Sequence, residues 1–215
     1  MIEVAKKKKI QASTRRYTIE AYFELEEKSL HKNEFINGKI RPMAGGTLNH
    51  NMLSGTIHAL LFMLFFNTEK VISIHNSDQK VYIPDFNKFT YTDTFVINGQ
   101  TETYKDGNQA ILNPTLIVEV ASKSTEAHDR TTKFRMYKSL PSFKEYVIVN
   151  QDMPIVEVFS KINDKQWKVT SYIGFDEVVQ FETIDATLKM SDIYKKAQDL
   201  KDPQLDIDFL DKEEL

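Results

Sequence analysis

The chain contains no cysteine, and it lacks a strong excess of positive charge. The absence of cysteine excludes disulfide bonds, thiolate zinc sites and cysteine nucleophiles, and it gives no indication of an oxidising compartment. The formal net charge is −3, which is not the balance of a protein that grips nucleic acid by charge alone. The histidines show no zinc-ligand spacing, and the sequence has no glycine-rich phosphate loop and no nucleophilic serine motif.

Long hydrophobic runs are also missing. The longest apolar stretch, Ala59 to Phe66, is far too short to span a bilayer. The N-terminus is basic, but no apolar segment follows it, so it does not read as a secretory signal. These absences predict a cytoplasmic protein that does not engage a membrane.

The chain is long and apolar enough for one sizeable core, with 215 residues of which 41% are hydrophobic. We expect a single domain over residues 17–198, because no repeat, low-complexity segment or linker divides it. A basic arm (residues 1–16) and an acidic tail (residues 199–215) flank this domain with net charges of +5 and −5. The arm could contact phosphates, although a solvated terminus is the reading that the pattern favours.

The hydrophobic pattern mixes helices with strands. Apolar spacing predicts helices at residues 18–29, 47–67 and 126–140 and from residue 191, and Asn37-Gly38 predicts a tight hairpin turn. Strands are expected near residues 34–36, 39–41, 71–74, 80–83, 94–97, 116–120, 155–161, 167–173, 178–181 and 187–190, with a further strand before residue 150 and a polar loop at residues 100–109. The pattern indicates an α+β or α/β fold.

One carboxylate stands out, because Glu119 interrupts the apolar run Leu116 to Val120. Such a run is typical of a strand that is buried on both faces. An ionised carboxylate is costly there unless it meets a cation or a metal. The sequence therefore predicts a partner for Glu119.

The segment around Glu119 reads NPTLIVEVAS, then Asp129 to Lys133 (DRTTK), Tyr137 and LPSFKEY, and NEFINGKIRPMAGGTLNHNMLSGTIHALL precedes it. This ordered series, over residues 17–172, resembles the Uma (second type) family of putative restriction endonucleases in the PD-(D/E)XK nuclease superfamily. The resemblance implies a restriction-endonuclease-like α+β core, which is a mixed sheet flanked by helices.

The resemblance also implies a magnesium-dependent (or manganese-dependent) endonuclease that hydrolyses DNA with metal-activated water. Two acids on adjacent strand ends suffice for magnesium, and Asp93 and Glu119 are the expected ligands. Asp93 follows threonine where such families usually have proline, so Asp85, which follows Pro84, remains the rival.

The lysine of the generic motif is replaced by Ala121. The resemblance assigns the catalytic cation to Lys133, with Lys123 as a nearby substitute that could contact substrate. The alternative for Lys133 is a surface ion pair with Asp129, four residues earlier on the same helix.

The resemblance implies three further site residues. Glu34 would be a third acid or would point at the site from the hairpin, His50 would orient water or touch a phosphate, and Tyr137 would hydrogen-bond a site carboxylate. Each also has a plain structural reading, as a solvated glutamate, a polar helix residue and a core tyrosine.

The remaining alternatives concern function and assembly. The departures at Thr92 and Ala121 leave open a catalytically inactive binding or assembly module with the nuclease fold. The segment Leu60 to Phe66 is apolar almost all round its helix, which predicts a homodimer or, alternatively, a central helix covered by its own sheet.

Overall fold

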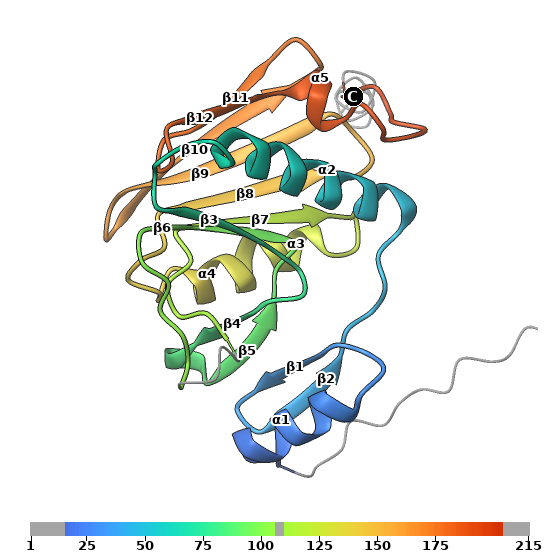
Figure 1. The fold of residues 1–215 in the computed structure, drawn as a ribbon. Helices are drawn as coiled ribbons and strands as arrows, with labels where there is room; N and C mark the ends of the chain where they lie inside the picture. Colours follow the sequence, from blue (N-terminus) through green and yellow to red (C-terminus); the bar gives the residue numbers. More distant parts are fainter. Residues whose placement is uncertain (1–15, 106–109, 204–215) are drawn as a thin grey trace, which may run out of the picture.

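The computed structural model describes residues 16–105 and 110–203 (Figure 1). Its helical elements are α1 (Ile19–Lys28), α2 (Leu48–Phe65), η1 (Pro84–Phe86), α3 (Glu126–His128), η2 (Asp129–Lys133), α4 (Phe134–Tyr137) and α5 (Met190–Ile193). Its strands are β1 (Asn33–Ile36), β2 (Lys39–Pro42), β3 (Ile72–Asn76), β4 (Lys80–Ile83), β5 (Lys88–Tyr91), β6 (Thr94–Asn98), β7 (Leu116–Ala121), β8 (Glu145–Asn150), β9 (Ile155–Asn163), β10 (Gln166–Ile173), β11 (Val178–Phe181) and β12 (Ala186–Lys189).

The largest sheet has six strands in the order β10-β9-β8-β7-β6-β3. Strands β7 and β8 are parallel, and all other neighbouring pairs in this sheet are antiparallel. A parallel pair needs a crossover connection, which here is the helical run α3-η2-α4. The mixed sheet flanked by helices that the family resemblance implies is confirmed.

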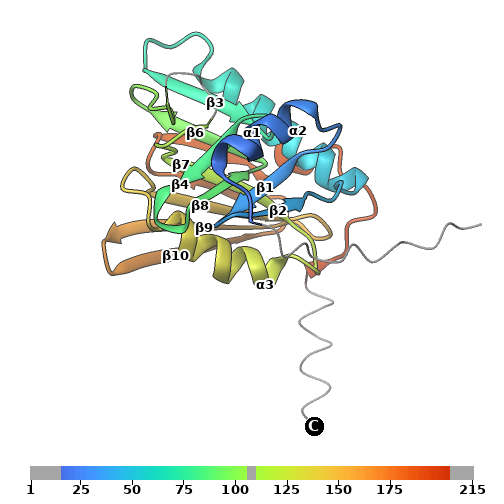
Figure 2. The same ribbon diagram turned by 90° about the horizontal axis from the view of Figure 1, so that it is seen from below.

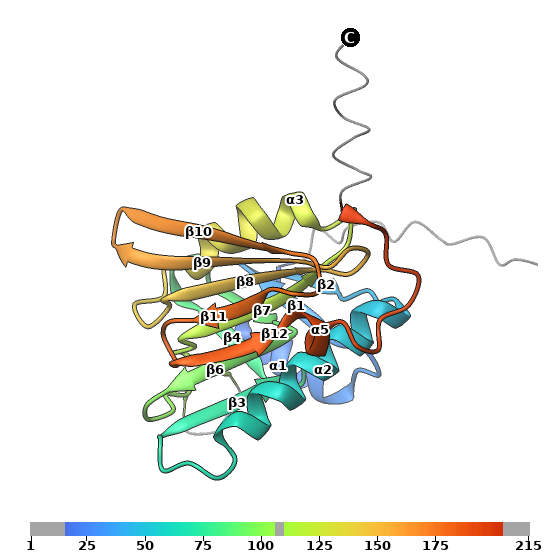
Figure 3. The same cartoon turned by 90° about the horizontal axis from the view of Figure 1, so that it is seen from above.

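The two faces of this sheet bury different sets of side chains. Val118 and Val120 of β7 pack with α2, α5 and the β11–β12 hairpin, whereas Ile117 and Ala121 pack with α4 and β4. Figure 3, seen from above, shows α2 and the β11–β12 hairpin over the first face, and α3 lies on the opposite side in Figure 2. Because alternate strand residues share a face, Glu119 belongs to the α4 face.

A second, four-stranded sheet has the order β2-β1-β5-β4 and carries α1. Thr18 caps α1 by accepting a hydrogen bond from the Ala21 N–H (3.2 Å), and Tyr22 inserts among Phe35 and Phe89 of the sheet. Strand β5 leads directly to β6 of the large sheet. The chain therefore passes from one sheet to the other just before Thr94.

Several elements differ from the pattern expected from sequence. Strand β5 replaces part of an expected turn, and β11 and β12 form a separate two-stranded sheet. Helix α1 packs on the small sheet, and the helix expected at residues 126–140 contains the π-helical segment η2. Residues 1–15 of the arm, 106–109 of the loop and 204–215 of the tail lie outside the described residues. Within the described ranges, no helix is both long and apolar enough to cross a membrane.

Candidate active site

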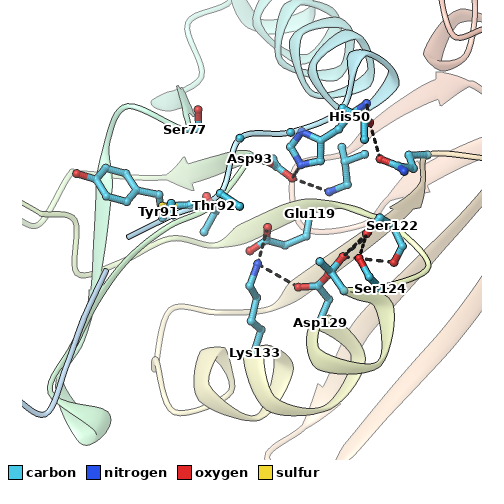
Figure 4. Close-up of a pocket in the computed structure, with 18 residues that line it drawn as sticks. His50, Ser77, Tyr91, Thr92, Asp93, Glu119, Ser122, Ser124, Asp129 and Lys133 are labelled. Carbon is cyan, nitrogen blue, oxygen red and sulfur yellow. Dashed lines mark hydrogen bonds and ion pairs between the residues drawn. The ribbon is translucent and has the colours of Figure 1, made fainter. Parts of the chain in front are cut away.

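A cavity of about 330 Å³ lies between the N-terminal end of α2, the start of β6, the end of β7 and η2 (Figure 4). Ionisable side chains from three elements and from the bend before β6 line it, namely His50, Asp93, Glu119, Asp129 and Lys133. Polar groups complete part of the wall, and they include Thr92, Ser122, Thr125 and Gln151. The structure thus brings Asp93, Glu119, Lys133 and His50 to one cavity.

Glu119 is only 4% exposed, and both of its carboxylate oxygens have a donor. The Tyr137 hydroxyl donates to Oε1 over 2.7 Å, and the Lys133 ammonium lies 3.1 Å from Oε2. Tyr137 and Lys133 are four residues apart on the helical run that covers this face of β7. The predicted partner of the lone strand carboxylate is therefore a lysine together with a tyrosine.

Lys133 contacts a second carboxylate, because its ammonium also lies 3.0 Å from Asp129 Oδ1. The ion pair with Asp129 that the sequence offered as an alternative is therefore present, but Asp129 is only 2% exposed, so the pair does not lie at the surface. The two residues bound the π-helical segment η2. Residues four apart lie on the same side of a helix, so the two side chains project in the same direction. This geometry lets Asp129 and Lys133 both face Glu119 (Figure 4).

Asp93 reaches the cavity from the bend between β5 and β6. Thr94 pairs with Val118 in the antiparallel ladder, so Asp93, one residue earlier, lies beside Glu119. Its Oδ2 accepts a hydrogen bond from the Val120 N–H (2.7 Å) and lies 3.2 Å from His50 Nε2. The Val120 N–H of β7 and the His50 side chain of α2 together hold the Asp93 carboxylate in place.

The charges of the cavity influence one another. Burial raises the pKa of Glu119 to about 7, the Lys133 cation opposes that rise, and the Asp93 and Asp129 charges add to it. Burial lowers the pKa of Lys133, but Glu119 and Asp129 outweigh burial and leave it above its usual value. The hydrogen bond to Asp93 raises the pKa of His50. Lys133 therefore carries its proton at neutral pH, while Glu119 would be eased into its charged form by further positive charge.

The donor set fits a hard divalent cation. In the described part of the chain, no cluster of three or more His, Cys, Asp or Glu side chains could hold a metal ion. Magnesium, however, commonly takes one or two carboxylates and leaves its other positions to water and substrate phosphate. Asp93 and Glu119 supply such a pair, and burial together with the Asp93 and Asp129 charges raises the pKa of Glu119 even though Lys133 lies beside it.

Three predicted residues do not reach the cavity. Asp85 is exposed in η1, and Lys123 is exposed in the turn after β7. Glu34 lies 3.1 Å from Lys88 Nζ and accepts a hydrogen bond from Thr90. Burial raises the pKa of Glu34, but Lys88, Thr90 and the more distant Lys133 lower it below its usual value. Glu34 therefore lies outside the cavity, and the Lys133 charge acts on its pKa from a distance.

The sequence reasoning missed two participants. Asp129 was considered only as a surface partner, although its place one turn before Lys133 was visible. Gln151 accepts a hydrogen bond from Thr47, the N-cap of α2, over 2.8 Å, and nothing in the local sequence indicates that contact.

The same fold occurs in the crystal structure of a putative nuclease belonging to DUF820 from Anabaena variabilis ATCC 29413. The two structures superpose with a TM-score of 0.66, over 83% of this chain and 98% of the other, at 14% sequence identity. The protein thus has a nuclease-like fold.

Sequence comparison gives the family. Residues 19–191 match the family Uma2, described as "Putative restriction endonuclease". The chain is also 32% identical over 172 residues to the uncharacterized protein sll1609 of Synechocystis sp. (strain ATCC 27184 / PCC 6803 / Kazusa), which covers 80% of this chain and 96% of the relative. A second uncharacterized protein of that strain, slr1290, is 30% identical over 176 residues, which cover 82% of this chain and 90% of the relative. The chain belongs to the Uma2 family of putative restriction endonucleases.

Proposed function

We propose that this protein is a metal-dependent endonuclease that hydrolyses phosphodiester bonds of DNA, with magnesium or manganese as its cofactor. The observation that carries the proposal is the convergence of Asp93, Glu119 and Lys133 on one cavity. Two oxygen ligands for a divalent cation and one half-buried ammonium are groups that can support phosphodiester hydrolysis by water.

Asp93 and Glu119 are the residues that would hold the cation. When bound there, a hard divalent cation lowers the pKa of an attached water and offsets the charge that gathers on the phosphate. The Val120 N–H and His50 keep Asp93 in place, and Tyr137 keeps Glu119 in place. Both carboxylates are therefore oriented before any ligand arrives, which lowers the cost of assembling the site.

Lys133 acts as an electrostatic group toward the phosphorane and not as a base. Its two carboxylate neighbours raise its pKa above the usual value, so its ammonium keeps its proton at neutral pH. It replaces the lysine that the generic motif places two residues after Glu119, where this chain has Ala121. Because Lys133 extends from the helix to Glu119, its ammonium supplies the same positive charge beside the same carboxylate.

The other candidates have supporting roles in this proposal. His50 contacts Asp93 and borders the cavity, so it is placed to touch a phosphate or its water. Glu34 acts through its charge on Lys133. Lys123, exposed beside the cavity mouth at Ser122 and Ser124, is placed to meet the DNA backbone.

Manganese-dependent nicking of supercoiled plasmid DNA tests the proposal. Wild type should nick with manganese or magnesium, and the Glu119→Gln variant should lose both activity and manganese binding, measured by calorimetry. Tyr172→Phe, on the far strand β10, serves as a control that should keep both. If the wild type shows no metal-dependent nicking on any DNA tested, the nuclease proposal is wrong and the alternative, a catalytically inactive binding module with the nuclease fold, is favoured.

We also propose that the protein forms a homodimer. Strand β3 is an edge strand of the large sheet, with β6 as its ladder partner. Beside it, the C-terminal part of α2 exposes Phe62 and Met63, Phe66 is exposed directly after the helix, and Val71 is exposed before β3. A second copy related by a twofold axis would meet like patches and would cover both the open edge and the apolar surface.

A further inference from the structure

Gly46 lies directly against the imidazole ring of His50. A Cβ atom at position 46 would be 2.6 Å from His50 Nδ1, 3.0 Å from His50 Cγ and 3.1 Å from Asn51 Oδ1. Real Cβ atoms essentially never approach other atoms to 2.6 Å, so any side chain here would displace the ring or the loop. The backbone of Gly46 does not need a positive φ, so space alone requires this glycine.

The neighbouring glycine differs in this respect. A Cβ atom at Gly45 would meet nothing within 4 Å, and its φ is not positive either. Two consecutive glycines of the same loop therefore differ in whether a side chain would meet the His50 ring and, beside it, the Asn51 side chain.

The contact with Gly46 replaces a hydrogen bond. A functional histidine is commonly held in orientation by a hydrogen bond at its second ring nitrogen. In the described structure, His50 Nδ1 is buried and has no hydrogen-bond partner, while Nε2 faces Asp93 Oδ2 at 3.2 Å. The ring thus has Asp93 at its Nε2 side and Gly46 close to its Nδ1 side, where a side chain would collide with it.

We propose that Gly46 is a positioning residue, which sets the orientation of His50 toward Asp93 and thereby the geometry of the proposed catalytic cavity. This inference rests on the proposed nuclease function for its kinetic consequence, but not for its structural one. Gly46 makes no contact with a reacting group in this scheme and acts only through His50.

The test compares Gly46→Ala with Gly45→Ala in the full chain. Gly46→Ala should lower kcat of plasmid nicking on the order of 10²-fold, the effect of misplacing an active-site group by about 1 Å, with little change in KM. Gly45→Ala should keep wild-type kcat. In a His50→Ala background, Gly46→Ala should cause no further loss, because the ring that it displaces is gone.

A second readout does not depend on activity or on metal. The imidazole carbon-bound proton resonances of His50, assigned by their loss in His50→Ala, should move in Gly46→Ala and stay unchanged in Gly45→Ala. Equal kinetic losses in the two glycine variants, or a full additional loss in the His50→Ala background, would overturn the proposal. So would an unshifted His50 resonance in Gly46→Ala, and that result decides the matter even if wild type nicks no DNA.

Discussion

Glu119 illustrates how one residue ties the core to the chemistry of the cavity. A carboxylate in the middle of a buried strand is costly by itself, and the fold compensates with one hydroxyl and one ammonium. Lys133 in turn satisfies two carboxylates, so neutralising it would leave Glu119 and Asp129 close together without a cation. The site is therefore a coupled set of charges in which each member depends on the next.

Replacing Lys133 should separate catalysis from metal binding. Lys133→Ala should raise the activation barrier by about 2 to 4 kcal/mol, the range for removal of one preorganised electrostatic donor, and should leave manganese binding largely intact. Initial rates of plasmid nicking and calorimetric titration with manganese measure the two quantities. Lys133→Met keeps most of the side-chain volume and should slow nicking as much as Lys133→Ala does. That result would assign the loss to the missing charge and not to missing packing.

A surface lysine provides the control for Lys133. Lys70 pairs with Asp185 at 3.4 Å, and both side chains are largely exposed. Lys70→Ala should leave nicking unchanged, because exposed ion pairs contribute little. If Lys133→Ala nicks as fast as Lys70→Ala, Lys133 has no catalytic role.

Glu34 should make the stability of the protein sensitive to acid. Its pKa is lowered in the fold from an ordinary value of 4.5, so its stabilising contribution is complete above about pH 4.5 and is lost as pH falls through the folded-state pKa. Urea unfolding of wild type and Glu34→Gln should differ most near pH 7 and should converge in acid. A difference that stays constant between pH 7 and pH 3.5 would contradict this assignment.

The sequence was sufficient to single out Glu119, because a charged residue in an apolar strand is visible without a structure. The burial of Asp129 was not predictable in this way, since helical spacing alone does not say which helix face meets a sheet. The pairing of Asp93 with the Val120 N–H depends on the register of two strands that are 17 residues apart, which no local pattern specifies.

At the scale of elements, the N-terminal end of α2 does more than begin a helix. Thr47 accepts a hydrogen bond from the His50 N–H (3.1 Å) and donates one to Gln151 Oε1 (2.8 Å). The same turn that starts the helix therefore also positions His50. Helix-capping and site geometry are coupled through one hydroxyl.

Removal of this cap should affect both stability and activity. Thr47→Ala should lower the free energy of unfolding by about 0.5 to 2 kcal/mol, the usual cost of a lost N-cap, and should also slow nicking. Thr18→Ala removes the N-cap of α1, which packs on the small sheet, and should lower stability similarly without slowing nicking. Denaturant unfolding and initial rates measure the two effects; equal rates for both variants would exclude the coupling.

Regular elements were largely predictable from their periodicity, and irregular ones were not. Strand β5 is short and follows η1, so Pro84 and Asp85 suggested only a turn. The π-helical segment η2 has the composition of an ordinary helix, so its sequence gives no sign of the π-helical geometry. Local preferences therefore indicated neither element.

At the scale of the whole molecule, the proposed dimer predicts a change in mass on mutation. Wild type should have the mass of two chains by light scattering at micromolar concentration. Phe66→Glu, at a side chain that is 62% exposed, should shift the protein to a monomer with an unchanged far-ultraviolet circular dichroism spectrum. Ile162→Glu introduces the same charge at a similarly exposed site (63%) near the opposite edge of the sheet and should remain dimeric. If the wild type has the mass of a single chain, the dimer proposal is wrong.

The anchoring of α2 has a consequence for the time at which the protein becomes active during its synthesis. Asn49 donates a hydrogen bond to the Gln198 carbonyl (2.7 Å) and accepts one from its N–H (3.0 Å), and Gln151 holds Thr47. The first turn of α2, which carries His50, is thus held by residues that are synthesised about 100 to 150 positions later. Because domains fold as their chain emerges, a nascent chain that carries every proposed catalytic residue would still lack the geometry to cut, and we expect ribosome-bound chains ending before residue 150 to leave DNA intact.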